Sequence, residues 1–152
     1  MTSPLLSIEL HAEPFEPYAA LNAWQEQLAA RLPAPAAAEA CFVGRVRGST
    51  AAAEPLQALE LEHYPGMTER QLQALAGAAA ARHGVAAVLV RHRIGRLQPG
   101  EAIVLVAVAA DRRGPAQRCA QDLLEALKHE APFWKREWSG GAGRWVRGNT
   151  AW

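Results

Sequence analysis

The chain has 152 residues, half of them hydrophobic, and 16 basic against 15 acidic residues give a formal net charge of +1. This size and apolar content predict a single domain, residues 1–152, that buries most of its apolar surface. A charge so near zero argues against a general nucleic-acid or membrane binder, so any anion site must come from local clustering of basic residues.

The sequence has no pattern typical of membrane targeting or membrane insertion. Residues 1–10 lack the basic and apolar pattern of a secretory leader, and the chain has no apolar run of 18 residues. We therefore expect a soluble, cytoplasmic protein. Cys41 and Cys119 have no metal-ligand spacing and lie in apolar patterns, which predicts two small buried thiols and no metal or other cofactor.

The first half of the chain predicts two helices and two strands. An amphipathic helix is marked by Tyr18, Leu21, Trp24, Leu28 and Leu32, and Pro33-Ala34-Pro35 ends it. Strands are expected at 39–47 and 56–64, where Leu59 and Leu61 alternate with glutamates. Thr68 with Gln71 is typical of a capping box, opening a helix that runs to about His83 before Gly84.

The second half predicts two central strands, a third helix and a C-terminal hairpin. The nearly continuous apolar runs 85–93 and 102–110 favour buried strands, joined by a turn at 95–100. Pro115 opens a helix, and after Pro132 come an aromatic strand, a loop at 139–143 and a closing strand at 144–146. The order α, β, β, α, β, β, α, β, β favours an α+β domain with a mixed or antiparallel sheet and about three helices.

The end of the third helix is the strongest candidate for chemistry. The core face of this helix is followed by Lys128, and Lys135 lies seven residues on, beyond Pro132 and beside aromatic residues. A lysine held away from water loses its proton more readily and can act as a nucleophile or proton carrier. The alternative is that both lysines are solvated surface charges.

Arginines at the ends of predicted elements could bind an anion. Arg45 and Arg47 alternate in one strand and so point to one side, as a two-pronged grip on an anion requires. Arg112 and Arg113 precede a helix N-terminus, where free N–H groups favour an anion such as phosphate. Solvated or salt-bridged arginines are the alternative in both places.

Histidines and tryptophans give weaker indications. His63 and His92 lack metal-ligand spacing, so structural roles are the better interpretation for both. The C-terminal aromatic residues would suit base stacking in a nucleic-acid-binding module, although a core or subunit interface is the commoner use. These residues are Trp134, Trp138, Trp145 and Trp152.

Four segments together resemble one known family. They are Gly44-Arg45-Val46-Arg47, Glu62-His63-Tyr64-Pro65-Gly66-Met67-Thr68-Glu69, His92-Arg93-Ile94-Gly95 with Pro99-Gly100-Glu101, and Ala131-Pro132-Phe133-Trp134-Lys135-Arg136-Glu137. In this order they are similar to the large, catalytic subunit of molybdopterin synthase, the MoaE family. The resemblance runs from about Phe42 to Val146 and implies that family's α/β-hammerhead-like fold.

The resemblance also implies a reaction and its partners. The family is a sulfurtransferase that converts cyclic pyranopterin monophosphate (precursor Z) to molybdopterin, in molybdenum cofactor biosynthesis. Its sulfur arrives as a thiocarboxylate on the C-terminal glycine of a small ubiquitin-like, MoaD-like subunit. A homodimer forms the centre of a heterotetramer with one small subunit at each end. No nucleic acid, membrane, metal or cofactor is implied.

Site residues follow from the same resemblance. Lys128 matches the family lysine beside the partner's terminal glycine, and Lys135 matches a second essential lysine, so both are expected to be catalytic. The family's pterin-phosphate site implies substrate-binding roles for a wider set that also includes the two lysines. This set is Arg45, Val46, Arg47, Asp111, Arg112, Lys128, Lys135, Arg136 and Glu137.

One position departs from the family pattern. Where many members have His-Arg, this chain has Asp111-Arg112, and an aspartate cannot act as an imidazole proton shuttle at neutral pH. Asp111 could orient Arg112 or Arg113, and His129 could replace the shuttle. A catalytically impaired member that only binds the small subunit is therefore the alternative to the enzyme.

Overall fold

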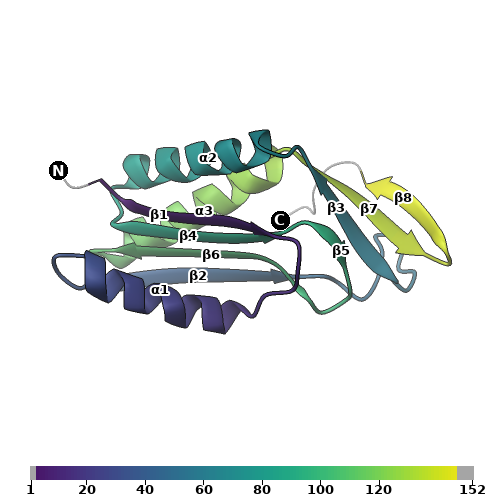
Figure 1. The fold of residues 1–152 in the computed structure, drawn as a ribbon, viewed down its shortest axis with the longest axis horizontal. Helices are drawn as coiled ribbons and strands as arrows, with labels where there is room; N and C mark the ends of the chain where they lie inside the picture. Colours follow the sequence, from purple (N-terminus) through teal and green to yellow (C-terminus); the bar gives the residue numbers. More distant parts are fainter. Residues whose placement is uncertain (1–2, 147–152) are drawn as a thin grey trace.

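A computed structural model of the chain describes residues 3–146, which form three helices and two four-stranded sheets (Figure 1). The first sheet has the order β1-β4-β6-β2 and the second the order β5-β3-β7-β8. The elements in chain order are β1 (Leu5–His11), α1 (Pro17–Arg31), β2 (Ala38–Arg45), β3 (Ala58–His63), α2 (Met67–His83), β4 (Ala87–Arg93), β5 (Gly95–Leu97), β6 (Ala102–Ala110), α3 (Arg113–His129), β7 (Phe133–Ser139) and β8 (Ala142–Val146).

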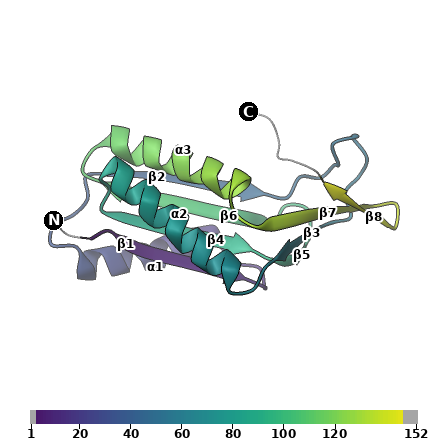
Figure 2. The ribbon, with the colours of Figure 1, turned by 90° about the horizontal axis from the view of Figure 1, so that it is seen from above.

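The first sheet is the middle layer of a three-layer arrangement. Helices α2 and α3 cover one face and α1 covers the other, as Figures 1 and 2 show. Because successive side chains of a strand point to opposite faces, β4 sends Val88 and Val90 to the core under α2 and α3. The residues that alternate with them, Ala87 and Leu89, pack with Trp24 of α1. Both faces are therefore buried, which explains why β4 and β6 read as continuous apolar runs.

The second sheet extends from one end of the first (Figure 1). All of its pairings are antiparallel, and β3 lies between β5 and β7. Its inner face carries Leu59 and Leu61, which pack with Leu97 and with Val46 from the segment after β2. The alternation predicted for this strand is confirmed, since Glu62 is exposed whereas Leu61 is 2% exposed.

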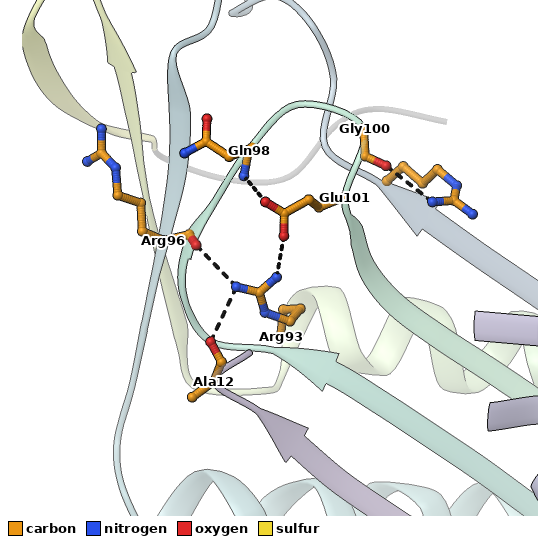
Figure 3. A network of polar contacts seen from close by, with 7 residues as sticks. Ala12, Arg93, Arg96, Gln98, Gly100 and Glu101 are labelled. Atoms are coloured by element: carbon orange, nitrogen blue, oxygen red, sulfur yellow. Dashed lines mark hydrogen bonds and ion pairs between the residues drawn. The ribbon is translucent and has the colours of Figure 1, made fainter. Parts of the chain in front are cut away.

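A buried arginine joins the two sheets (Figure 3). Arg93, 2% exposed at the end of β4, donates to the Glu101 carboxylate over 2.7 Å and to the carbonyl oxygens of Arg96 and Ala12 over 3.1 and 3.3 Å. Glu101 in turn accepts from the Gln98 N–H over 2.8 Å. One side chain thus ties the loop after β1 to strand β5 and to the β5–β6 turn, where the chain passes between the sheets.

The predicted helices are present with small shifts at their ends. The left-handed residue Gly84, with φ of 64°, ends α2 as predicted. The start of α2 was placed wrongly at Thr68, because the helix is capped at Gly66, whose N–H donates to the Glu69 carboxylate over 2.8 Å. Helix α3 begins at Arg113, ahead of the Pro115 signal.

Three further sequence predictions need correction. Two strands were missed, the seven-residue β1 and the three-residue β5, and the strands form two sheets where one was expected. Cys41 was expected to be buried but is exposed, because β2 is an edge strand of the first sheet. Cys119 is buried as predicted, on the core face of α3. The α+β class itself is confirmed.

Candidate active site

The two lysines come together where α3 ends and β7 begins. Lys128 is in the last turn of α3, and Lys135 is the third residue of β7, with only residues 130–132 between the two elements. Both side chains are partly buried. Burial, and next the charge of Lys128, lower the pKa of Lys135, while Glu137 acts in the opposite direction. The fold thus favours the neutral amine of Lys135 more than water does.

Strand alternation divides the segment Lys135-Arg136-Glu137 between two faces. Lys135 is paired with Leu61 and Glu137 with Leu59, so both lie on the inner face of the second sheet. Arg136 is paired with Glu60 and points to the other face. The structure therefore groups Glu137 with the lysines and separates Arg136 from them.

Arg136 is held on that outer face by acidic and aromatic neighbours. Its guanidinium lies 3.5 Å from Glu60 and 3.6 Å from Glu62, and 4.2 Å from the centre of the Trp145 ring. Trp138 contacts the same guanidinium at 5.5 Å. This cation–π and ion-pair cluster gives Arg136 a stabilising role in the β3-β7-β8 sheet.

Arg45, Val46 and Arg47 lie at the same end of the first sheet as the lysines. Strand β2 runs antiparallel to β6 with Arg45 opposite Ala102, and α3 packs over β2 and returns toward this end. Arg45 and Arg47 are exposed, and Arg45 donates to the Gly100 carbonyl over 3.2 Å. Val46 is 5% exposed, and its N–H and C=O bond to Glu101 and Gly100. Val46 therefore anchors the two arginines and has no backbone group left for a ligand.

Asp111 and Arg112 lie at the N-terminal end of α3, opposite the end that carries Lys128. Arg112 is the N-cap of α3, and Lys128 lies 16 positions further along the chain. At 1.5 Å per residue the two positions are about 24 Å apart along the helix. A cavity of about 320 Å³ lies beside Asp111, and its lining includes Arg31 and Pro33 but neither lysine. One copy of the chain thus does not bring all of the predicted site residues together.

Two residues beside the lysines had no predicted part in the site. His92, at the end of β4, stacks on Phe133 with ring centres 4.0 Å apart and planes 7° from parallel. Burial is the main reason that the pKa of His92 falls to about 4, and the charge of Lys135 also lowers it. The sequence predicted a structural histidine here, and the apolar pattern of β4 was the only signal for its burial.

The tryptophans are not a closed core cluster. Trp134 and Trp145 are 49% and 52% exposed, whereas Trp138 is partly buried under Arg96 and Arg136. Trp152 lies outside the described residues. Of the C-terminal tryptophans that the structure describes, Trp138 alone fits the predicted core role. An interface role for Trp134 and Trp145 stays a prediction.

This end of the molecule carries the amines of Lys128 and Lys135, which have different surroundings. It also carries the exposed guanidinium groups of Arg45 and Arg47. An ammonium can stabilise a developing oxyanion, and a neutral amine can accept a proton. Guanidinium groups suit phosphate because their planar fork gives paired hydrogen bonds. Among residues 3–146, no helix is long and apolar enough to cross a bilayer.

Comparison with known proteins gives the family. The fold and the site define an α+β domain with two neighbouring lysines where α3 is followed by β7. The family model described as MoaE protein matches residues 11–130. The molybdopterin synthase catalytic subunit of Cereibacter sphaeroides is 42% identical over 146 residues, 96% of this chain and 94% of the relative. The subunit of the same name from Pasteurella multocida is 37% identical over 141 residues, 93% and 89% of the two chains.

Solved structures agree with this result. The molybdopterin biosynthesis MoaE protein from Burkholderia ambifaria has a TM-score of 0.75 and 42% identity, covering 93% of this chain and 89% of that one. Molybdopterin synthase from Staphylococcus aureus has a TM-score of 0.73 and 25% identity, covering 97% and 98%. The chain belongs to the MoaE family.

Proposed function

We propose that this chain is the catalytic subunit of a molybdopterin synthase. It would transfer sulfur to cyclic pyranopterin monophosphate from the thiocarboxylated C-terminal glycine of a small ubiquitin-like subunit. The observation that carries the proposal is the placement of Lys128 at the end of α3 and Lys135 at the start of β7, near enough for the charge of Lys128 to lower the pKa of Lys135, in a member of the MoaE family. Relatives that align with nearly the whole chain bear the name of this enzyme.

The lysines have complementary roles in this proposal. Lys128 lies in the last turn of α3, partly exposed and able to reach an incoming peptide tail. Once the thiocarboxylate sulfur has bonded to the pterin, water attacks the carbonyl of the resulting thioester, and the Lys128 ammonium stabilises the oxyanion that forms. The acyl C–S bond then breaks, which leaves the sulfur on the pterin and a carboxylate on the glycine. Lys135, with its lowered pKa, exchanges protons with the pterin as its ring opens.

The phosphate of the substrate binds to arginines in this proposal. Arg45 and Arg47 are exposed at the lysine end of the sheet, where they could grip an anion beside the reacting atoms. Glu137 shares the inner face with Lys135 and orients its amine, while Arg136 supports the sheet from the other face. Val46 holds the arginine pair in place.

A second copy of the chain completes the pocket. Asp111 and Arg112 are about 24 Å from Lys128 along α3, which is too far for one phosphate and one pair of amines to share. A homodimer in which the N-terminal end of one α3 approaches the lysines of the other copy would assemble the whole set. With one small subunit at each end, this gives a heterotetramer, which we place in the cytoplasm.

The proposed binding of a small partner subunit does not depend on the dimer. Subunits 1 and 2 of a molybdopterin-converting factor from Helicobacter pylori have been solved as a protein–protein complex, and one chain of it shares the fold of this protein with 22% identity and a TM-score of 0.73. The impaired, binding-only alternative rests on Asp111. Nothing in the geometry of the lysine end favours it.

A single-turnover assay separates the enzyme from a binding protein. Thiocarboxylated small subunit and precursor Z are mixed with this protein, and both molybdopterin and the protein complex are measured. We expect product as well as complex. Complex formation without any dithiolene product would show a binding subunit and contradict the proposed function.

Mixed dimers test the shared pocket. As a homodimer, each variant is expected to lose activity. Lys128→Ala should slow the sulfur-transfer step, and Arg112→Ala should weaken substrate binding. Co-assembled, they should recover activity, because one pocket in each heterodimer then contains both wild-type residues. Failure to recover activity in verified heterodimers would place both residues in the same copy's site.

A further inference from the structure

A stacked ring pair connects the first sheet to the strand that carries Lys135. His92 belongs to β4 and Phe133 to β7, and their rings lie nearly parallel at 4.0 Å. His92 is 9% exposed and lies on the face of the sheet that α2 and α3 cover, in line with Val88 and Val90. The contact therefore fixes the first residue of β7 two positions before Lys135.

The hydrogen bond of His92 defines its tautomer. Its Nδ1 lies 2.8 Å from the carbonyl oxygen of Arg93. A carbonyl only accepts, so Nδ1 carries the proton. Burial lowers the pKa of His92 to about 4, so near neutral pH the ring is uncharged and Nε2 is unprotonated. That carbonyl belongs to the residue whose guanidinium binds Glu101, Arg96 and Ala12 (Figure 3), so the ring is fixed to a rigid junction.

The start of β7 is held from a second side by α2. The buried Thr68 hydroxyl donates to the carbonyl of Pro132 over 3.3 Å and accepts from the Tyr64 N–H over 2.9 Å. The chain between the two lysines is thus clamped by Thr68 at Pro132 and by His92 at Phe133. These clamps determine how β7 leaves the end of α3.

We propose that His92 is a positioning residue for the sulfur-transfer reaction: its neutral ring, stacked on Phe133, holds Lys135 beside Lys128 in a partly water-excluded site. This inference rests on the proposed function for its effect on turnover. Its effect on Lys135 itself requires no turnover. A neutral ring serves here because an imidazolium would add a third positive charge beside the two lysines.

The other ionisable groups around Lys135 do not replace this role. On β7 and the adjoining strands, the same inner face carries Glu137, Arg144 opposite it on β8, and His63 opposite Phe133 on β3. His63 lies 4.0 Å from Glu69 of α2. Lys128 is the charged group contributed by α3. Among all of these, His92 is the residue that stacks on β7.

The test measures the reactivity of Lys135 directly. The intact protein is acylated with an amine-selective reagent across a pH series, and modification of Lys135 is quantified by peptide mass spectrometry. In the parent protein we expect a midpoint below that of an ordinary lysine. In His92→Ala the midpoint should rise, because water enters beside the amine, and the single-turnover rate should fall about tenfold or more from misplacement.

Two variants separate the ring from the imidazole chemistry. His92→Phe keeps a neutral stacked ring and should retain the midpoint and a rate within about threefold of the parent. Phe133→Leu keeps an apolar side chain but removes the stack, so it should reproduce the shift even if His92→Ala does not fold. His11→Ala is the control, since it removes another histidine–phenylalanine contact, with Phe15 at 5.2 Å, on a different face of the sheet.

The outcomes distinguish this inference from the proposed function. An unchanged Lys135 midpoint in folded His92→Ala or Phe133→Leu protein would overturn the positioning role. A shift of the same size in His11→Ala would do so as well, because it would reflect general loosening. A parent protein without turnover would contradict the proposed function, yet the Lys135 titration would still decide the role of His92.

Discussion

Replacing Arg93 with methionine should destabilise the fold by about 3–5 kcal/mol, the cost of breaking a buried charged pair from one side. Arg93 is 2% exposed and bonds to Glu101 and to the carbonyls of Ala12 and Arg96. Methionine fills similar space but donates to none of them. For a domain of this size such a loss corresponds to a fall in Tm of about 6–20 °C.

Chemical denaturation of the parent and Arg93→Met proteins measures this difference. Arg82→Met is the matched control, because Arg82 also binds a carboxylate, Asp122, over 2.7 Å but is 55% exposed. An exposed pair of this kind contributes about 0–1 kcal/mol. If the two variants lose equal stability, or if Arg93→Met loses less than about 1 kcal/mol, the junction in Figure 3 does not hold the sheets together.

The same pair predicts a pH dependence. Hydrogen bonds from the Gln98 N–H and then from Arg93 lower the pKa of Glu101. A carboxyl group with a lowered folded-state pKa adds stability above its unfolded pKa, about 4.3, and this is lost as the pH falls through the folded value. The stability difference between parent and Arg93→Met should therefore shrink in acid. A constant difference down to that pH range would contradict the assigned ion pair.

Three further changes test packing, backbone and the contact between α2 and α3. Leu123→Ala empties a fully buried position of α3 and should cost about 2–5 kcal/mol by denaturation, unless the core collapses around it. Gly84→Ala places a Cβ on a residue in the left-handed conformation, with φ of 64°, and should lower the free energy of unfolding by about 1 kcal/mol. An unchanged Tm would show that alanine is not strained at this position. Hydrogen bonds from His83 and Arg82 lower the pKa of Asp122 in the folded protein. Asp122 therefore stabilises the fold above the pKa of its carboxyl group in the unfolded chain, and this contribution is lost as the pH falls through the folded-state pKa. Asp122→Asn should remove this part of the acid dependence, and an unaltered pH profile would contradict it.

The long, strongly patterned elements could be predicted from the sequence. The three helices and the central strands β4 and β6 were found because their apolar spacing repeats over many residues. β5 was missed because it has only three residues and begins with Gly95, whose φ of 85° is typical of a turn. β1 was missed because its parallel pairing with β4 depends on residues more than 80 positions away.

The candidate site was predictable in part. The two lysines were placed together because Pro132 ends the helix between them, and the structure confirms that β7 begins at the next residue. The separation of Arg136 from Lys135 follows from strand alternation, but only once β7 is known to be a strand. The distance of Arg112 from Lys128 follows from the length of α3, which spans 17 residues. The role of His92 depends on a contact between two sheets, and no local pattern indicates it.

The stacking of His92 also explains an otherwise unusual buried polar group. A histidine at 9% exposure in an apolar strand would weaken the core unless its polar atoms were satisfied. Its bond to the Arg93 carbonyl satisfies Nδ1, and the Phe133 ring covers its face. The residue therefore fits the core without a charge.

The most direct test of the central claim is a single-turnover assay of Lys128→Ala with thiocarboxylated small subunit and precursor Z. Gln121→Ala, an exposed position on the same helix, is the control, and partner binding is measured for both variants. We expect Lys128→Ala to bind the small subunit and form no molybdopterin, while Gln121→Ala remains as active as the parent. Molybdopterin formed by Lys128→Ala at the parent rate would contradict the lysine-centred mechanism.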